Sequence, residues 1–589
     1  MTPAVLGIDA GTTAVKAVLY SLEGETLAAG HRSVAVVRTP DGGAESDIDL
    51  VWEAVVGAVR QALSQARSTA PDVVAIGVTG QGDGAWLVDA EGRPVRPAAL
   101  WLDGRNADRV TAWQRDGRDA AVIAATGSAS FPGTLPVLLD GFAETEPDVL
   151  ARAAHHLNCK DAVRHRLAGE VATDPSEASR TYLDPATLAY SDEMIDALDH
   201  RRFAHLLPPV RAPHERGGTL TDDAAAELGL RAGVPVAIGL VDSAACPVGL
   251  GALADQDGWV VLGTTATVAV NRVDRAAADS GVGILIPTGR GTQVLEALSS
   301  MVGTPNLDWV RGTLGLADRS WTELERLART APDGSGGVIY LPYGSPSGER
   351  APFVDAAASA SWVGMNVTTT PAQLLRSVFE GLAFSVAECL DLLDAADRVP
   401  VCGGGARSDL LCQLLADVSG RTIVRTADPE VGARGAATVA LVAAGLADDL
   451  ETAVRVFPAD SVEFTPRPSP ALAAAREVFA RVRAALRPEW PALRSLGRLA
   501  AAAPPAGTGE TTAVAHTPQA AAAAPAADGS EPPVAARADD SEPPAAARAD
   551  VSEPPAAARA DVERTAAAAP AAHLDAPSLD VPAPERTSA

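Results

Sequence analysis

Short apolar runs alternate with longer segments of helical periodicity over most of the chain. Runs rich in Val, Ile, Leu and Ala predict buried strands at residues 5–9, 16–20, 73–79, 234–241, 259–262 and 399–402. Apolar positions spaced three or four residues apart predict helices at residues 51–67 and 374–393. Strands that alternate with helices indicate an α/β fold.

Two of these strands lead into the same kind of turn. Gly11-Thr12-Thr13 connects the strand at 5–9 to the strand at 16–20, and Gly263-Thr264-Thr265 follows the strand at 259–262, about 250 residues later. A dinucleotide-binding unit would place a helix, not a second strand, after its first glycines. Two strand-turn-strand motifs of this kind, so far apart in the chain, predict two related lobes rather than a short repeat.

Length and charge narrow the choice of function. A chain of 589 residues is too long for one ordinary core, and 47% apolar residues are enough to fill more than one. The formal net charge of −27 repels phosphate backbones and anionic lipid, so we expect neither a nucleic-acid nor a membrane partner. The five cysteines form no CxxC pair and no basic region precedes the first apolar run, so we expect a cytoplasmic protein without a signal peptide.

The last part of the chain, residues 491–589, is predicted to be a disordered Ala/Pro-rich tail. Residues 501–589 contain no Phe, Trp, Tyr, Ile or Met. An 11-residue unit that begins Ser-Glu-Pro-Pro recurs from Ser530, Ser541 and Ser552. A segment with so few bulky apolar groups cannot offset the entropy lost on ordering, so we expect a partly polyproline-II chain.

A carboxylate next to a hydroxyl-bearing turn suggests a site for a metal ion and phosphates. Asp9 ends the first strand, and Thr12 and Thr13 offer hydroxyls beside the amide N–H groups of the turn. This set suits Mg²⁺ on the carboxylate and phosphate oxygens on the turn. The alternative is a plain β-hairpin with favourable turn residues.

Two further strand ends are followed by small residues. Asp242 follows the strand at 234–241 and precedes Ser243-Ala244-Ala245, which lets a ligand approach the backbone. Capping of the next helix is the alternative role for Asp242. Gly403, Gly404 and Gly405 follow the strand at 399–402 and permit close approach of a flat ring or a ribose.

Together these motifs, with Leu341-Pro342-Tyr343, Gly348-Glu349-Arg350 and the segment 376–383, resemble the FGGY family of carbohydrate kinases over residues 3–490. The resemblance implies two actin/hexokinase-like (ribonuclease H-like) lobes, residues 1–245 and 246–490. ATP and a small sugar or polyol would bind in the cleft between the lobes. A homodimer is compatible with the resemblance.

The resemblance also implies a role for each site residue. Asp242 would be the general base toward a terminal hydroxyl of the substrate, and Asp9 would hold Mg²⁺. The residues implied in phosphate binding are Thr12, Thr13, Gly263, Thr264 and Thr265, and those implied in adenosine binding are Gly404, Gly405 and Ala406.

Substrate recognition is expected from Gln81, Asp83, Asp103, Arg105 and Asp242. Gly82 and Asp83 stand where xylulokinases carry Met and His after the glutamine, and Asp103 and Arg105 match the family's Trp-x-Asp-x-Arg element. A carboxylate accepts hydrogen bonds from substrate hydroxyls. The alternative for Asp83 is a turn residue between two glycines.

The Gln-Gly-Asp-Gly element, Asn158-Cys159-Lys160-Asp161 and the segment 172–179 are most similar to erythritol kinases. An erythritol-like polyol is therefore the lead substrate, and a ketose such as xylulose is the second. Two other classes stay open at this point, actin-like ATPases that are not kinases and sugar-responsive regulators. The former would lack a base equivalent to Asp242, and the latter would need a basic DNA-binding helix-turn-helix that the sequence does not show.

Overall fold

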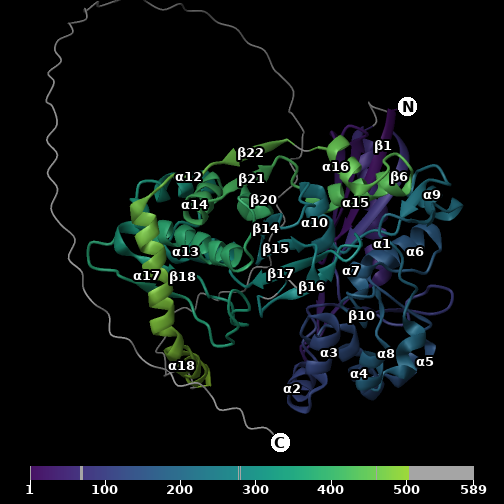
Figure 1. The fold of residues 1–589 in the computed structure, drawn as a ribbon, viewed down its shortest axis with the longest axis horizontal. Helices are drawn as coiled ribbons and strands as arrows, with labels where there is room; N and C mark the ends of the chain where they lie inside the picture. The colour runs from purple at the N-terminus through teal and green to yellow at the C-terminus, as the bar shows by residue number, and fades with distance from the viewer. Residues whose placement is uncertain (1, 67–70, 276–277, 279, 459, 503–589) are drawn as a thin grey trace, which may run out of the picture. The chain divides into compact units, whose positions relative to one another are not determined.

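Two mixed β-sheets, one in each half of the chain, organise the fold (Figure 1). The structure is a computed structural model and describes residues 2–66, 71–275, 278, 280–458 and 460–502. The first sheet has the strand order β12-β13-β6-β1-β2-β3, and the second has the order β16-β17-β15-β14-β20-β21-β22. The strands of the first sheet are β1 (Thr2–Ala10), β2 (Ala14–Ser21), β3 (Thr26–Ser33), β6 (Pro71–Gly80), β12 (Arg216–Thr219) and β13 (Pro235–Ala237). Those of the second are β14 (Gly258–Leu262), β15 (Ala266–Arg272), β16 (Ile284–Pro287), β17 (Val294–Ser300), β20 (Arg398–Cys402), β21 (Thr422–Thr426) and β22 (Ser461–Phe464).

The two sheets share one topology. In the first, β1 pairs antiparallel with β2 and parallel with β6, and β6 pairs parallel with β13. In the second, β14 pairs antiparallel with β15 and parallel with β20, and β20 pairs parallel with β21. The outer antiparallel pairs, β2 with β3 and β15 with β17, also correspond. The predicted duplication into two related lobes is confirmed, and we call the sheets with their helices the first and second lobe.

Most predicted strands are present, but the one predicted at residues 234–241 is shorter. Only Pro235–Ala237 pairs with its neighbours as β13. At Gly239 the backbone turns to φ 84°, and a Cβ there would overlap the carbonyl oxygen of Val78 in β6. The apolar run therefore continues into a buried connection rather than a strand, and this connection leads directly to Asp242.

The two predicted helices are confirmed with slightly different ends. Helix α1 (Ile48–Gln65) is capped by Asp47, whose side chain accepts from the amides of Asp49 and Leu50, and it packs on β2 and β3. Helix α13 (Pro371–Leu392) begins with a capping box between Thr370 and Gln373.

The remaining helices and short strands connect these elements. The helices are α2 (Ala107–Asp116), α3 (Arg118–Thr126), α4 (Leu135–Thr145), α5 (Pro147–Arg152), α6 (Cys159–Ala168), α7 (Pro175–Ala178), α8 (Asp192–Ala197), α9 (Asp222–Leu228), α10 (Asp242–Leu250), α11 (Pro305–Thr313), α12 (Trp321–Ala328), α14 (Asp409–Ser419), α15 (Val431–Ala443), α16 (Leu450–Val456), α17 (Pro470–Leu486) and α18 (Trp490–Ala502). The short strands are β4 (Val37–Arg38), β5 (Ala44–Ser46), β7 (Trp86–Val88), β8 (Ala98–Ala99), β9 (His155–Leu157), β10 (Leu183–Asp184), β11 (Ala189–Tyr190), β18 (Ile339–Leu341) and β19 (Ser361–Val363).

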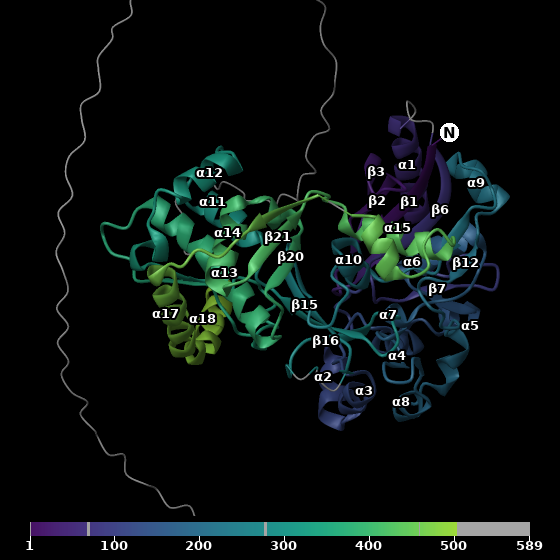
Figure 2. The same cartoon turned by 45° about the horizontal axis from the view of Figure 1, so that its top comes forward.

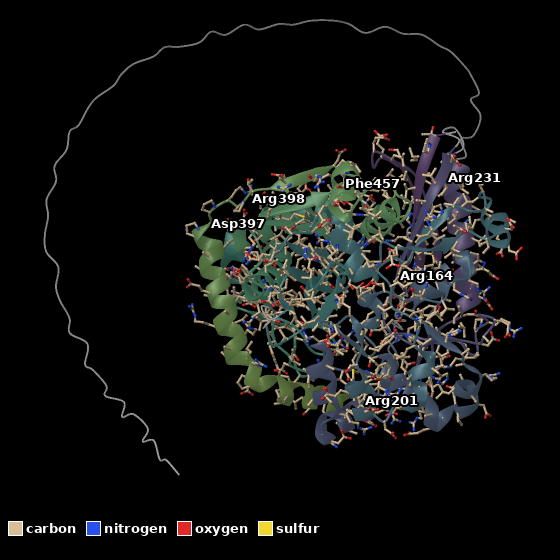
Figure 3. All side chains as sticks on the ribbon, turned by 45° about the vertical axis from the view of Figure 1, so that its right-hand side comes forward. Arg164, Arg201, Arg231, Asp397, Arg398 and Phe457 are labelled. Carbon is tan, nitrogen blue, oxygen red and sulfur yellow. The ribbon has the colours of Figure 1, made fainter. Side chains whose placement is uncertain are left out.

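Helix α15 lies between β21 and β22 of the second sheet in the chain but packs on the first sheet. In Figure 2 it lies beside β1 and β6. Glycines make this contact possible, because a Cβ on Gly7 of β1 or Gly77 of β6 would overlap carbonyl oxygens of α15. Phe457, just after α16, packs edge-on against Tyr20 of β2 with ring centroids 5.3 Å apart (Figure 3). The predicted second lobe, residues 246–490, therefore contributes a helix to the first.

The last described helix corrects the predicted start of the tail. Residues 491–502 belong to α18, which begins at the fully buried Trp490. Trp490 stacks on Phe353 with ring centroids 5.9 Å apart, and Arg494 donates to the carbonyls of Ser345 and Ala358. The Ala-rich composition did not reveal this helix, because Trp490 and Arg494 hold it through contacts with residues that are distant in the chain. The rest of the predicted tail lies outside the described residues.

In the described part of the chain, none of the helices combines the length and apolar character needed to cross a membrane. All five cysteines are free thiols.

Candidate functional site

Each of the two predicted phosphate turns is closed by a hydrogen bond from the amide of its glycine, although the two bonds span different numbers of residues. In the first, the amide of Gly11 donates to the carbonyl of Ala14 (3.1 Å), and in the second, the amide of Gly263 donates to the carbonyl of Thr265 (2.9 Å). Each turn closes an antiparallel strand pair, β1 with β2 and β14 with β15. The hydroxyl of Thr12 accepts from the indole of Trp101 (3.0 Å), which links the first turn to the predicted Trp-x-Asp-x-Arg element.

Asp9 stands at the end of β1, opposite Lys16 on one side and Thr79 of β6 on the other. Burial raises the pKa of the Asp9 carboxyl, and the nearby charge of Glu430 raises it further against the opposing effect of Lys16. The ammonium of Lys16 is held 2.7 Å from Glu430. Burial is therefore the main cause of the raised pKa, because the Lys16–Glu430 pair places one positive and one negative charge beside Asp9.

Asp242 is the first residue of α10. Its Oδ1 accepts from the amide of Ser243 (2.6 Å), and α10 shows no side-chain cap, so the helix-capping alternative is not what the structure supports. Burial raises the pKa of Asp242 to about 7, and the charges of Asp9 and Asp83 add to the rise. The structure therefore brings Asp9, Asp83 and Asp242 into one electrostatic cluster.

The glycine loop after β20 packs against the second phosphate turn. Gly403 has φ 90°, and a Cβ on it would lie 2.7 Å from the carbonyl oxygen of Leu262, the residue before Gly263. A Cβ on Gly405 would lie 2.9 Å from the side chain of Leu262, whereas Gly404 faces open space. Ala406 is buried. The predicted adenosine residues and the second phosphate turn are therefore neighbours.

Other parts of the second lobe and helix α10 also lie near the second phosphate turn. The amide of Thr304 donates to the carbonyl of Gly263 (2.9 Å). A small, mainly apolar cavity of about 20 Å³ lies beside it, lined by Gly263, Gly303, Thr304 and side chains of α13 and α14. The thiol of Cys246, one turn after Asp242, is hydrogen-bonded to Cys402, which raises its pKa. Cys402 precedes Gly403, so α10 and the glycine loop are in contact.

Gln81 and Asp83 follow β6 and have unused hydrogen-bonding capacity. The side chain of Gln81 is buried, and apart from the thiol of Cys159 its amide group has no partner in the described chain. Asp83 adopts φ 60° between Gly82 and Gly84, and burial raises its pKa against the opposing charge of Arg180. Buried polar atoms without partners are costly, so this loop is built to meet a ligand or ordered water.

Asp103 and Arg105, by contrast, are engaged with the protein. Asp103 is buried, its Oδ2 accepts from the amide of Ala44 (3.1 Å), and it forms an ion pair with Arg105 at 2.7 Å. Arg105 also contacts Glu45 at 2.9 Å. These partners tie Asp103 and Arg105 to β5, and they leave Asp103 little capacity for a substrate.

Sequence reasoning missed two residues near the loop that follows β6. They are Glu177 and Arg180. Both carboxylate oxygens of Glu177 are buried without a hydrogen-bond partner, and burial raises its pKa well above the usual range. Arg180 forms an ion pair with Asp83 at 3.4 Å. Both residues lie on or just after the four-residue helix α7, and no spacing or composition in the segment 172–180 distinguishes them as site residues.

A network of buried ion pairs contacts the N-terminal end of α7. Lys160 of α6 lies 2.6 Å from Asp161 and 3.0 Å from Asp174, the residue that caps α7. Arg164, labelled in Figure 3, is fully buried and donates to the carbonyl of Glu170 (3.1 Å). These paired charges hold the backbone on which Glu177 and Arg180 stand.

Comparisons with known proteins agree with this arrangement. Models of the FGGY family of carbohydrate kinases match residues 4–249 with the N-terminal domain and residues 258–444 with the C-terminal domain. Erythritol kinase from Brucella abortus (strain 2308) is 31% identical over 509 residues, which cover 83% of this chain and 98% of the relative. Xylulose kinase from Escherichia coli (strain K12) is 34% identical over 451 residues, covering 74% and 90%.

A solved structure shares the fold. The crystal structure of a xylulose kinase from Brucella ovis superposes with a TM-score of 0.74 at 28% identity and covers 84% of this chain and all of that chain. The relatives are kinases of sugars or polyols, and the two lobes, their hairpin turns and the carboxylate cluster are arranged in the order expected for such an enzyme. The chain therefore belongs to the FGGY family of carbohydrate kinases.

Proposed function

We propose that this enzyme transfers the γ-phosphate of ATP to a terminal hydroxyl of a small neutral polyol, with erythritol as the lead substrate. The erythritol kinase relative, which aligns over nearly its whole length, supports the polyol. The Gln-Gly-Asp-Gly loop at residues 81–84 supports it as well, because it offers an amide and a carboxylate but no aromatic or imidazole ring.

The observation that best supports the proposal is the raised pKa of the Asp242 carboxyl group. Its pKa is raised to about 7 by burial and by the neighbouring carboxylates. A general base is most effective when its pKa lies near the working pH, since it is then both available and basic enough to accept a proton. In a loose phosphoryl-transfer transition state the hydroxyl loses its proton late, so Asp242 also serves to orient the attacking oxygen.

Asp9 fits the role of a magnesium ligand. Mg²⁺ is commonly held by one or two carboxylates together with substrate phosphates, so the absence of a three-residue metal cluster among the described residues does not argue against it. The raised pKa of Asp9 is caused mainly by burial, and a bound cation would stabilise the ionised carboxylate there. When bound with ATP, Mg²⁺ would neutralise charge on the phosphates.

The turns at residues 11–13 and 263–265 are proposed to hold the phosphates through their amides and hydroxyls. Gly404, Gly405 and Ala406 are proposed to lie against the adenosine, since Gly404 leaves open space there. Gln81, Asp83 and Asp242 are proposed to bind the substrate. Asp103 and Arg105 are not included, because their charges pair with each other and with Glu45.

A ketose such as xylulose is the second candidate substrate. The xylulose kinase relative from Escherichia coli, at 34% identity, favours it. The five free thiols support a reducing compartment such as the cytoplasm. A homodimer stays a prediction.

The decisive experiment measures ADP release in a coupled assay with Mg-ATP and a panel of substrates. We expect release that depends strictly on substrate, with the highest kcat/KM for erythritol among erythritol, glycerol, xylitol, xylulose and ribulose. The Asp242→Asn variant is the matched control for catalysis. ADP release without any substrate would indicate an ATPase of another class, and a clear preference for xylulose would select the second candidate.

A further inference from the structure

Arg180 is a buried cation with unused donors that faces the partly buried carboxylate of Asp83. Its side chain is 5% exposed, and neither Nε nor Nη2 has a hydrogen-bond partner. Its Nε lies 3.4 Å from Oδ1 of Asp83, and that oxygen is also without a hydrogen bond. The two groups neutralise each other, but their separation leaves the hydrogen-bonding capacity of both largely unspent.

The pair is fixed from both sides. The amide of Arg180 donates to the carbonyl of Glu177 (3.1 Å), and its guanidinium lies 5.5 Å from the centre of the Phe131 ring. Asp83 is one of the few non-glycine residues with positive φ, at 60°. A backbone conformation of this kind costs energy and persists where the surrounding structure imposes it, often at a ligand site.

The pair also lies next to the proposed catalytic base. The charge of Asp83 contributes to the raised pKa of Asp242, although burial is the larger cause. The backbone also links Asp83 to Asp242. Gly82, the residue before Asp83, lies against Val241, the residue before Asp242, because a Cβ on Gly82 would come 2.6 Å from the Val241 side chain. A substrate whose hydroxyl reaches Asp242 therefore has its remaining hydroxyls within the region of Asp83 and Arg180.

We propose that Arg180 and Asp83 bind substrate hydroxyls as a donor–acceptor pair, and that their mutual neutralisation selects uncharged polyols over sugar acids. This inference rests on the proposed function and deepens it. A hydroxyl group can accept from Arg180 and donate to Asp83 at the same time. A carboxylate in the same place gains from Arg180 but is repelled by Asp83, so the pair discriminates by charge.

The same reasoning predicts how the selectivity can be reversed. Arginine presents a planar fork of donors that matches a carboxylate in two parallel hydrogen bonds. If Asp83 loses its charge, Arg180 becomes a buried, unpaired cation that favours an anionic substrate. Asp83→Asn keeps the size of the side chain, so it changes the charge with little change in shape.

The test compares kcat/KM for erythritol and for erythronate, the four-carbon acid with one end oxidised. Wild type should prefer erythritol strongly. Asp83→Asn should lose roughly 10- to 150-fold on erythritol, the equivalent of one charged hydrogen bond, and gain at least tenfold in relative preference for erythronate. The double variant Asp83→Asn/Arg180→Gln should lose that gain. KM for ATP should stay within about twofold throughout.

Asp196→Asn is the matched control, because Asp196 of α8 has an exposed side chain that pairs with Arg201 at 2.6 Å. It should leave both substrates unchanged. Arg180→Lys, which keeps the charge but not the planar fork, should lose at least tenfold on erythritol, and it decides the question if Asp83→Asn does not fold. Melting temperatures with and without each substrate, in the absence of ATP, report binding separately from turnover.

Two outcomes would overturn the inference while leaving the kinase intact. One is an Asp83→Asn enzyme with an unchanged ratio of erythritol to erythronate. The other is an Arg180→Lys enzyme as active as wild type. If wild type phosphorylates no polyol in the panel, the proposed function itself fails, and the two failures are thereby distinguished.

Discussion

A Cβ atom on Gly435 of α15 would overlap the carbonyl oxygen of Ala245 in α10. The contact is reciprocal, because a Cβ on Gly249 of α10 would overlap the carbonyl oxygen of Val431 in α15. The two helices therefore touch backbone to backbone, and α10 is the helix that begins with Asp242. The position of the proposed base depends on how closely α15 can approach.

Gly435→Ala should destabilise the enzyme by roughly 1–3 kcal/mol or more, because the added methyl group forces the two helices apart. Thermal unfolding measures the loss. Gly312→Ala in α11 is the matched control, since a Cβ there meets nothing within 4 Å. The control should gain up to about 1 kcal/mol from helix propensity. Equal melting temperatures for the two variants would argue against a tight contact between α10 and α15.

Asp242→Asn should lower kcat by about 10²–10⁴, the usual contribution of a general base, while substrate and ATP still bind. Steady-state kinetics measure the first effect, and substrate-induced shifts of the melting temperature measure the second. A kcat within a few-fold of wild type would show that another group accepts the proton.

The raised pKa of Asp242, about 7 through burial and neighbouring carboxylates, predicts a pH dependence of activity. The active form is the carboxylate, so kcat/KM should fall about tenfold per pH unit below about 7. A flat profile between pH 5.5 and 7.5 would contradict the assignment. Asp242→Asn removes this titrating group, so any residual activity of the variant should lack that acid limb.

The free energy of unfolding should change with pH in the direction opposite to the activity. Because the pKa of Asp242 is higher in the folded state than the unfolded value near 3.9, the folded state binds the proton more tightly, and stability falls as pH rises from about 4 to 7. The Asp242→Asn variant has no carboxyl group to ionise at this position, so it does not lose this stability. The variant should therefore melt above wild type at pH 8, by up to about 4 kcal/mol in stability, and the difference should shrink toward pH 4.

Two truncations test the end of the ordered fold. A chain that ends at residue 502 should unfold at the same temperature as the full chain and keep its activity. A chain that ends at residue 489 loses Trp490, which is buried against Phe353, and Arg494. It should lose about 3–5 kcal/mol, the usual cost of removing a buried tryptophan side chain. A lower melting temperature for the chain ending at 502 would mean that later residues also stabilise the fold.

The sequence predicts most of the local structure because apolar periodicity and turn residues act locally. The strands on both sides of Gly11 and Gly263, the helix predicted at residues 374–393 and the position of Asp242 at a chain turn follow from neighbouring residues alone. The two matching hairpins were sufficient to predict a duplicated fold.

What the sequence did not predict depends on contacts between distant segments. Arg180 is close to Asp83 only after the segment following α7 folds against the loop after β6. Asp103 resembled a substrate ligand until its partners Ala44 and Arg105 were in place. The elevated pKa of Asp242 likewise requires burial and the nearby Asp9, neither of which a linear pattern reports.

The return of α15 to the first sheet has a consequence for synthesis on the ribosome. The first sheet has all its strands once β13 ends at Ala237, but the helix that covers β1 and β6 ends only at Ala443. At roughly 5–20 residues per second, the nascent chain waits about 10–40 s for that helix. During this interval the glycine-lined face around Gly7 and Gly77 stays uncovered, which makes the half-made chain a natural client for chaperones that bind apolar surfaces.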